Sequence, residues 1–497
     1  MNIITRDWIR DDALFYADNP CREYTKQDLC EFTNYWKQYL VDKGAKKGDK
    51  IGLGITPVDI HYQAIMLAVY ELGMKLVILH RPNNKKECET PKSNAHLPLD
   101  YYMIFSSFEE NQVFGLAAKH YMANTKNVIT FHVSDWQKEK HTYRLKDDLV
   151  GILAEPKDDL LLCNTSGTTS EPKLIFHTHE YLYKLCDWNW KELEYTEDDV
   201  VLHLSTINHG ASLSVFAFPA FRAAKKQFFN ISAPNENYTV VLAENPTEPY
   251  YYDFLVKHCQ YYGVTKILCA NGAFIDNLVK AINRSEHGLP NTTIVVLCFI
   301  NPRWSIPIEE NKLKAVSSPY GCSEAGGPIF NIKLDKDNSY NFDPRFLGMP
   351  TKGFYKTSLV DDKLNVELPI VNKNIDTEDN IKEVWGGYYF VGKNKLKRIN
   401  DIDINPIDII ELVEYYSSRY NFEVYVDEVY NELFIITNDP LMIHYKQKIV
   451  DDVTKFYNNH VTIKDIIFDP QLDKATVSNK ADKYKLSETI QRYRNGN

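Results

Sequence analysis

The chain has 497 residues, of which 44% are hydrophobic and 25% are charged, and its formal net charge is −10 at pH 7. This length exceeds one ordinary hydrophobic core, and the composition excludes a disordered chain, so two or more folded domains are expected. The negative charge disfavours a general nucleic-acid-binding protein, which needs a basic face.

The N-terminal residues MNIITRDWIRDD lack the apolar stretch of a secretory signal. The run nearest to a membrane span, residues 65–74, is short and interrupted. The nine cysteines are scattered without a CxxC pair, which favours reduced thiols. We therefore expect a cytoplasmic protein with no integral membrane segment.

The N-terminal half alternates between helical and strand patterns. Apolar spacing predicts a helix over residues 24–42, with Thr25 as N-cap and Asp28 three residues later. A strand over 51–55, a helix over 59–73 and a strand over 75–79 follow, which is a βαβ rhythm. Further buried strands are predicted at 200–205, 239–243, 266–270 and 293–299, with a helix over 253–263. This order predicts an α/β fold with a mostly parallel sheet.

The composition changes after residue 330. Residues 330–400 predict short antiparallel strands, ending in a charged hairpin over 386–400. Beyond it we expect a separate unit with helices over 406–418 and 441–458. We place the boundary near Lys393, which divides the chain into residues 1–392 and 393–497.

Residues 165–173, TSGTTSEPK, are too small and polar to pack a core. An isolated run of this kind is about as often a solvated surface loop as a binding loop. Here it lies between two apolar runs, DDLLLCN and LIFHTHEYL, and so at a strand end, where α/β domains bind ligands. Hydroxyls, backbone N–H groups and Lys173 suit phosphate oxygens. The pattern GxxxxGK[ST] is absent, which disfavours an ordinary P-loop NTPase.

The segment TSGTTSEPKLIFHTH resembles the phosphate-binding motif TSGTTGxPK of the adenylate-forming superfamily, which includes acyl-CoA synthetases, adenylation domains of nonribosomal peptide synthetases and luciferases. Other segments resemble the family's motifs in the family's order: YTKQDL, KGAKKGDK, PYGCSEAGG (319–327), FLGMPTKGFYKTSLVDD (346–362), DTEDN (376–380), LKRINDIDINPIDIIE (396–411) and KATVSNKADK (474–483). The resemblance extends from about residue 24 to residue 485.

The resemblance implies a fold and a two-step reaction. The fold would be a large N-terminal domain of several subdomains, with mostly parallel sheets flanked by helices and a small β-barrel-like part, and a small mobile α+β C-terminal lid domain. In the reaction, a carboxylate attacks the α-phosphate of ATP in the presence of Mg²⁺, which releases pyrophosphate and leaves an acyl-adenylate. The acyl group then passes to CoA, to a carrier protein or to an amine.

The resemblance also implies roles for individual residues. The residues expected to wrap the β- and γ-phosphates are Thr165, Ser166, Gly167, Thr168 (also a catalytic candidate), Thr169 and Lys173. Glu324 would be catalytic and hold Mg²⁺. Those expected at the adenylate are Tyr320, Gly321, Ser323, Asp379 as the ribose ligand, and Lys393. Lys480 would be catalytic and bridge the carboxylate and the α-phosphate, while His209 and Asn301 would line the acyl pocket. Isolated, each of these residues is more often a surface or core residue, and Cys322 is a small filler rather than a nucleophile.

Several glycines of the family's motifs are replaced in this chain. The replacements are Ser170, Glu378, Asp401 and Asn479. Asn and Asp tolerate left-handed backbone better than other side chains, so we expect positions 401 and 479 to keep their shape. Ser170 and Glu378 are harder to reconcile. Asp401 replaces a glycine that lines the pantetheine tunnel in acyl-CoA synthetases, so the adenylation step is better supported than the thioester step.

We therefore predict an acyl-CoA synthetase-like ligase. The first alternative transfers the acyl group to a carrier protein or an amine. The segment NHGASL (208–213) lacks the Asp that commonly pairs with a substrate amine, which weakens an amino-acid substrate. The second alternative is a degenerate, non-catalytic ATP-binding or scaffold protein, favoured by the lost glycines and opposed by the retained Lys173, Glu324, Asp379 and Lys480.

Overall fold

The structure is a computed structural model of the whole chain. It describes residues 2–18, 21–54, 59–79, 98–105, 119, 121–131, 151–164, 174–204, 210–229, 231–232, 239–240, 249–269, 272–297, 307–339, 346–384, 387–393, 397–404, 406–413, 416, 422–470, 474–475, 480–481 and 483–495.

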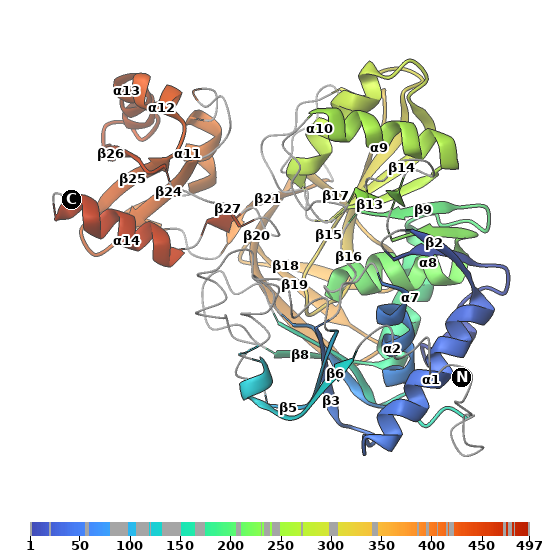
Figure 1. Cartoon of the computed structure of the whole chain (residues 1–497). Helices are drawn as coiled ribbons and strands as arrows, with labels where there is room; N and C mark the ends of the chain where they lie inside the picture. The colour runs from blue at the N-terminus through green and yellow to red at the C-terminus, as the bar shows by residue number, and fades with distance from the viewer. Residues whose placement is uncertain are drawn as a thin grey trace.

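A 13-stranded sheet runs through the molecule (Figure 1). Its strands, in spatial order, are β18 (Lys356–Val360), β19 (Lys363–Leu368), β20 (Lys373–Val384), β21 (Gly387–Lys393), β17 (Phe346–Pro350), β16 (Pro328–Leu334), β15 (Leu313–Gly321), β14 (Leu289–Val296), β13 (Lys266–Cys269), β9 (Val200–His203), β10 (Lys226–Phe228), β1 (Leu14–Ala17) and β2 (Arg22–Thr25). The strands from β15 to β1 pair in parallel, and those from β15 to β18 pair antiparallel. The predicted parallel sheet and antiparallel region are therefore both present, joined in one sheet.

A second sheet contains six strands. They are, in order, β6 (Thr125–Phe131), β5 (Leu99–Phe105), β3 (Lys50–Gly54), β4 (Lys75–Val77), β7 (Asp159–Asn164) and β8 (Leu174–Thr178). All pairs are parallel except β7 with β8. The chain thus enters residues 165–173 at the end of β7 and returns from them along β8, the antiparallel edge strand.

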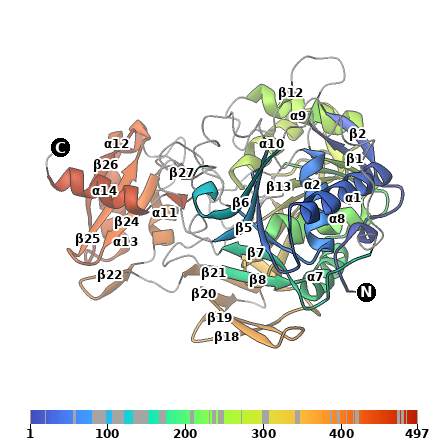
Figure 2. The same ribbon diagram turned by 60° about the horizontal axis from the view of Figure 1, so that its bottom comes forward.

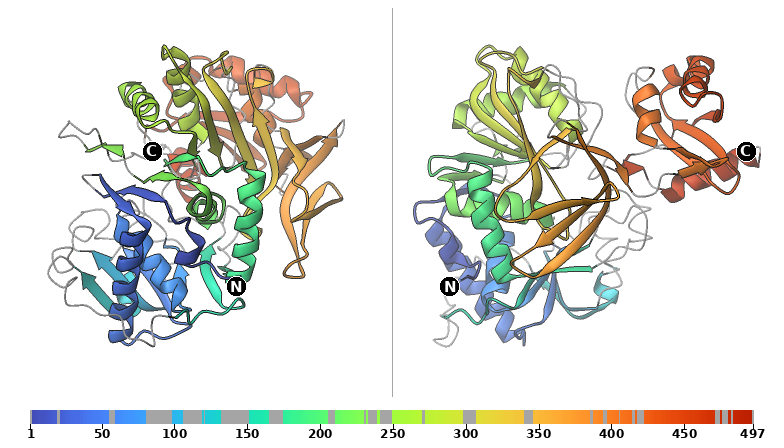
Figure 3. Two further views of the ribbon diagram at one scale, coloured as in Figure 1. Left: turned by 90° about the vertical axis from the view of Figure 1, so that its right-hand side faces the viewer. Right: turned by 180° about the vertical axis from the view of Figure 1, so that it is seen from behind.

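Helices pack against both sheets (Figures 2 and 3). They are the 3-10 helix Arg6–Trp8, α1 (Lys26–Asp42), α2 (Ile60–Glu71), α7 (His179–Glu192), the π-helix Ser212–Ala217, α8 (Phe218–Ala223), α9 (Pro249–Tyr262) and α10 (Gly272–Arg284). The predicted cap of α1 is confirmed, because Thr25 and Asp28 form a capping box. Apolar residues of α9 and α10 share one core with β9, β13 and β14.

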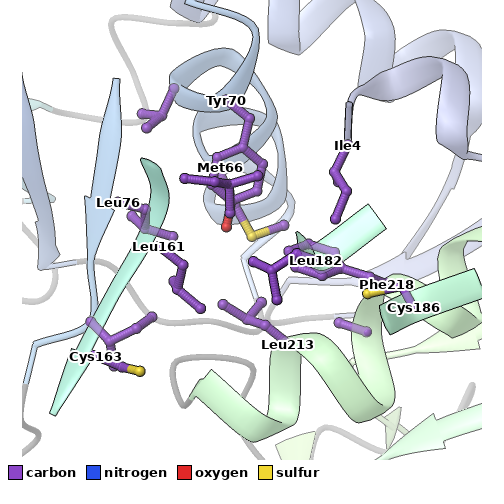
Figure 4. Packing of buried hydrophobic residues seen from close by; sticks show 14 of the residues in the cluster. Ile4, Met66, Tyr70, Leu76, Leu161, Cys163, Leu182, Cys186, Leu213 and Phe218 are labelled. Carbon is purple, nitrogen blue, oxygen red and sulfur yellow. The ribbon is translucent and has the colours of Figure 1, made fainter. Parts of the chain in front are cut away.

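The largest core lies where α2, α7 and the six-stranded sheet meet (Figure 4). Met66 and Tyr70 of α2 pack there against Leu161 of β7 and Leu182 of α7. Cys163, also in this core, lies on β7 immediately before the strand ends. The core therefore fixes the strand end from which residues 165–173 leave.

The C-terminal elements gather at one side of the molecule (Figure 1). They are β22 (Lys397–Ile399), β23 (Ile402–Ile404), α11 (Pro406–Val413), β24 (Phe422–Asp427), β25 (Glu432–Thr437), α12 (Pro440–His444), α13 (Lys446–Phe456), β26 (Ile463–Phe468), β27 (Lys474–Ala475), β28 (Lys480–Ala481) and α14 (Lys483–Arg494). The sheet β24-β25-β26 and helices α11–α13 share a core formed by residues 399–466. The division at residues 392 and 393 remains a prediction.

Two expected elements are wrong. The hairpin over 386–400 does not form, because β21 pairs with β17 and β20 whereas β22 pairs with β23. Thr239–Val240 (β12) does not join the parallel sheet but pairs antiparallel with β11 (Ile231–Ser232). In both cases the residue pattern indicates a strand without identifying its partner.

Within the described part of the chain, no helix has the length and apolar character needed to cross a membrane.

A buried histidine at the start of α7 makes stability depend on pH. His179 is fully buried, and neither ring nitrogen has a hydrogen-bond partner among the described residues. Burial lowers the pKa of His179 to about 4. The unfolded chain therefore binds a proton near the ordinary value of about 6.5, while the folded chain does not. The free energy of unfolding must fall as the pH drops from about 6.5 towards 4.

We predict that His179→Phe reduces this loss of stability. Between pH 7 and pH 5 the variant should lose about 1–2 kcal/mol less unfolding free energy than the wild type. Urea denaturation at both pH values measures the difference. Equal losses in the two proteins would contradict the assignment of a buried neutral imidazole.

Candidate active site

A tight turn follows β15 and carries the acidic residue of the segment PYGCSEAGG. The amides of Ala325 and Gly326 both donate to the carbonyl oxygen of Cys322, at 3.2 and 3.0 Å. Gly326 has φ of 69°, a left-handed conformation that favours glycine. The turn projects Ser323 and Glu324 from the end of the strand.

Four side chains from other parts of the chain hold the backbone of this turn. His177 Nε2 lies 2.9 Å from the Ser323 carbonyl oxygen. The hydroxyls of Tyr181 and Tyr355 donate to the Ala325 carbonyl oxygen at 2.5 and 3.1 Å. The Ser214 hydroxyl donates to the carbonyl oxygen of Gly326. We refer to these four side chains, His177, Tyr181, Ser214 and Tyr355, as the turn clamp.

Glu324 lies close to the end of β7. Burial raises the pKa of the Cys163 thiol to about 12, and the charge of Glu324 contributes to the same shift. Burial and the Glu324 charge also raise the pKa of Cys322 to about 12. Cys322 is therefore a protonated thiol at neutral pH, in agreement with its interpretation as a filler rather than a nucleophile.

The donor set around Glu324 fits Mg²⁺ better than a structural metal ion. The described residues contain no cluster of three or more His, Cys, Asp or Glu that could hold a metal ion. Mg²⁺ is commonly held by one or two carboxylates together with substrate phosphates, so a single glutamate would suffice where a nucleotide supplies the other ligands.

Tyr320 and Asp379 are joined by a hydrogen bond from the tyrosine hydroxyl to Oδ2 of the carboxylate. Both residues are buried, with exposed fractions of 6% and 5%. Strands β15 and β20, which carry them, are separated by β16, β17 and β21. In a flat sheet they would lie about 19 Å apart, at about 4.8 Å per strand. The antiparallel part of the sheet must therefore curl, which produces the expected barrel-like part.

Asp379 also has a defined partner across the sheet. It is directly opposite Lys393 in the antiparallel register of β20 and β21. Two residues predicted to bind the nucleotide thus lie opposite each other in the register of neighbouring strands. The side chain of Lys393 lies outside the described residues.

The chain that follows the predicted acyl-pocket segment, residues 208–213, is hydrogen-bonded to the same turn through Ser214. Gly210 packs so closely that a Cβ added to it would lie 3.2 Å from Cys163 Sγ. The following residues form the π-helix, and Ser214 within it belongs to the turn clamp. Residues 210–217 therefore contact both the end of β7 and the turn that carries Glu324.

Several predicted residues cannot be placed in this way. Those outside the described residues are Thr165, Ser166, Gly167, Thr168, Thr169, Lys173, His209 and Asn301. The backbone of Lys480 lies in β28, opposite Ala475 of β27, but its side chain is not described. The structure brings together Tyr320, Gly321, Ser323, Glu324 and Asp379, and it adds Lys393 by register.

Two of the replaced glycines occupy positions that need no glycine. Glu378 lies inside β20, where extended backbone accommodates any side chain. Asn400 and Asp401 have φ of 49° and 65° and link Ile399 to Ile402, which pair across the hairpin. Such a two-residue turn accepts Asn and Asp, so the prediction that Asp401 keeps the left-handed conformation is confirmed. Ser170 and Asn479 lie outside the described residues.

Sequence reasoning did not identify the turn clamp. None of its members lies in PYGCSEAGG, the segment that forms the turn; Tyr355 lies within FLGMPTKGFYKTSLVDD, and both His177 and Tyr181 lie within LIFHTHEYL. The only available signal was the concentration of polar side chains in that otherwise apolar segment.

We predict that Gly321→Ala destabilises the protein, because the added Cβ would overlap the carbonyl oxygen of Gly327 and lie 3.0 Å from its carbonyl carbon. Since this neighbour is backbone, we expect a loss of about 1–3 kcal/mol in urea denaturation. Gly151→Ala is the matched control, because a Cβ there meets nothing within 4 Å. Equal stability of the two variants would show that the backbone of Gly327 does not pack closely against Gly321.

Residues 8–372 match the AMP-binding enzyme family. A stretch of 200 residues is 26% identical to the uncharacterized acyl-CoA ligase YtcI of Bacillus subtilis (strain 168), and this match covers 38% of the chain and 35% of that relative. The chain thus spans about a third of the length of the curated relative that it matches.

Solved structures with the same fold cover nearly the whole chain. The adenylation and carrier-protein unit of McyG, complexed with phenylalanyl-adenylate, has a TM-score of 0.72 at 16% identity and covers 99% of this chain and 96% of its own. ATP-bound MatB from Rhodopseudomonas palustris has a TM-score of 0.71 at 15% identity, covering 97% and 96%. A benzoate CoA ligase from Burkholderia xenovorans LB400 has a TM-score of 0.67 at 15% identity, covering 95% and 96%. The family model matches residues 8–372, and the motif residues Tyr320 and Asp379 meet within one curled sheet. We conclude that this chain belongs to the AMP-binding enzyme family.

Proposed function

We propose that this chain is an ATP-dependent carboxylate-activating ligase. Its first products would be an acyl-adenylate and pyrophosphate, and its final product would be an acyl-CoA thioester. The observation that carries the proposal is the hydrogen bond between Tyr320 and Asp379, next to the turn that bears Glu324. An aromatic ring, a carboxylate for a ribose and a carboxylate for Mg²⁺ then belong to one site, as an adenylating enzyme requires.

Each residue of this site would have a physical task. Asp379 accepts hydrogen bonds from the ribose hydroxyls, and such charge-assisted bonds are stronger than neutral ones. The ring of Tyr320 covers the adenine. Glu324 holds Mg²⁺, which neutralises phosphate charge when bound. Residues 165–169 and Lys173, which follow β7, wrap the phosphates with N–H groups, hydroxyls and a cation.

Lys480 would complete the site from the C-terminal unit. Because a carboxylate must approach a polyphosphate, the reaction needs a cation between the two anions. Lys480 bridges the carboxylate and the α-phosphate when residues 393–497 swing onto residues 1–392, and it withdraws for the second step.

CoA is our first choice of acceptor. The partial relative is named an acyl-CoA ligase, and benzoate CoA ligase shares the fold. The alternative acceptor is a carrier protein or an amine, and the McyG structure contains a carrier-protein unit. The substrate is a small carboxylic acid, and the lack of an Asp in residues 208–213 disfavours an amino acid in this role. We expect the reaction to take place in the cytoplasm.

A non-catalytic binding or scaffold role is the competing proposal. Its support came from the replaced glycines, but two of these replacements are compatible with the backbone at their positions and so no longer support a degenerate site. Glu378 occupies an extended strand and Asp401 a turn that accepts Asp. The retained carboxylates Glu324 and Asp379 favour an enzyme.

We predict carboxylate-dependent ATP–pyrophosphate exchange with at least one member of a panel of fatty, aryl and amino acids. Lys480→Ala should reduce this exchange by about 10²–10³-fold, because a preorganised cation is lost from the reacting atoms. Binding of ATP, measured by calorimetry, should survive in the variant.

Lys474→Ala is the matched control, because Lys474 lies on β27, the strand paired with β28. Exchange should be unchanged in this variant. If no acid supports exchange and the protein does not bind ATP, the proposal that the chain is a carboxylate-activating enzyme is refuted. Equal exchange rates in Lys480→Ala and the wild type would show that Lys480 is not the catalytic lysine.

A separate prediction concerns the second step. Asp401→Gly should increase the rate of thioester formation with CoA while leaving exchange unchanged, because it removes a carboxylate from the expected pantetheine path. The turn accepts glycine with φ near 65°, so we expect a stability change of less than about 1 kcal/mol.

Asp401→Asn separates charge from bulk, since Asn has the same shape and no charge. If the rate of thioester formation rises in Asp401→Asn as well as in Asp401→Gly, the charge of Asp401 repels the incoming thiol. If the wild type forms the adenylate without any thioester, and Asp401→Gly does not restore it, a carrier protein or an amine becomes the preferred acceptor.

A further inference from the structure

His177 connects two segments that the proposed reaction needs to keep in register. It lies on β8, the strand that returns from residues 165–173. Its Nε2 is 2.9 Å from the carbonyl oxygen of Ser323, the residue before Glu324. Since a carbonyl oxygen can only accept, Nε2 must carry the hydrogen.

The surroundings of His177 fix its ring in one orientation. Only 4% of the residue is exposed. The ring stacks on Tyr181, with ring centroids 5.4 Å apart and an angle of 11° between the planes. The Tyr181 hydroxyl itself donates to another carbonyl oxygen of the turn, that of Ala325, two residues after Ser323. The imidazole is thus packed between a fixed ring and the backbone that it supports.

His177 differs from the other members of the turn clamp in what it joins. Tyr181, Tyr355 and Ser214 act on Ala325 and Gly326, beyond Glu324. His177 alone among these four lies on the strand attached to the predicted phosphate-binding loop, and it acts on the residue immediately before Glu324. Its hydrogen bond therefore spans the gap between the loop strand and the acidic residue.

We propose that His177 is a positioning residue that fixes Glu324 relative to strand β8, and so controls the use of Mg²⁺ with ATP. The proposal rests on the proposed function, because it assumes that Glu324 holds the Mg²⁺ that accompanies ATP. His177 touches neither group and acts through the backbone of Ser323. Partners of this kind, which orient a metal-binding residue, typically change metal affinity or activity 10–100-fold when they are removed.

The test uses His177→Phe, which keeps a ring against Tyr181 and removes only the donor. In ATP–pyrophosphate exchange, the Mg²⁺ concentration for half-maximal rate should rise about 10–100-fold. Binding of ATP without Mg²⁺ should be unchanged in calorimetry, while the gain in affinity on adding Mg²⁺ should shrink. His177→Gln, whose amide can donate from a similar position, should recover most of the Mg²⁺ response.

His179→Phe is the matched control. It replaces a buried histidine two positions along the chain that makes no side-chain hydrogen bond among the described residues. It should keep the Mg²⁺ response of the wild type. If His177→Phe does not fold, His177→Leu takes its place, with the same expectations.

Three results would overturn the inference: an unchanged Mg²⁺ response in His177→Phe, an equal loss in His179→Phe, or no recovery in His177→Gln. A wild type that neither exchanges pyrophosphate nor binds ATP would instead refute the proposed function. Hydrogen exchange of the Ala325 and Gly326 amides, which donate to Cys322, then decides the positioning role. Faster exchange in His177→Phe but not in His179→Phe supports it, and equal exchange in all three proteins rejects it.

Discussion

A backbone carbonyl that is buried must find a donor, and the turn after β15 satisfies this requirement with side chains rather than with a strand. Three of its carbonyl oxygens, those of Ser323, Ala325 and Gly326, accept from β8, α7, the π-helix and Tyr355. An unpaired carbonyl would cost about 1–3 kcal/mol. The turn is therefore fixed at the meeting point of both sheets, and Glu324 is fixed with it.

The curl of the antiparallel strands is the second requirement. Without it, Asp379 could not reach Tyr320, because three strands separate β20 from β15. The buried aromatic residues Tyr320, Phe330 and Phe390 fill the inside of the curl, with ring centroids 5.9 and 6.3 Å from Tyr320. Packing and the hydrogen bond from Tyr320 to Asp379 thus bring together the groups that we assign to the nucleotide.

Much of this arrangement could be predicted from local patterns. The capping box of Thr25 and Asp28, the βαβ rhythm of β3 to β4 and the antiparallel strands after residue 330 follow from spacing and residue type. The order of the motifs indicated the family, which the match over residues 8–372 confirms. The left-handed Asp401 followed from the tolerance of Asp for that conformation.

The remainder depends on contacts that no local pattern encodes. Strand β22 leaves β21 for β23, and β12 pairs with β11, because partner choice is settled by tertiary packing. The bond from His177 to Ser323 joins residues 146 positions apart, so neither periodicity nor a motif could reveal it. For the same reason, the sequence predicted that Tyr320 and Asp379 serve the same nucleotide, whereas their direct hydrogen bond could not be predicted.

The central claim is that the nucleotide binds where β7, β15 and β20 converge. A crystal structure with a non-hydrolysable ATP analogue and Mg²⁺ tests it most directly. The account predicts adenine against Tyr320, the ribose on Asp379 and the phosphates between Glu324 and residues 165–173. A nucleotide bound elsewhere on the chain, with Asp379 and Glu324 both out of its reach, would contradict it.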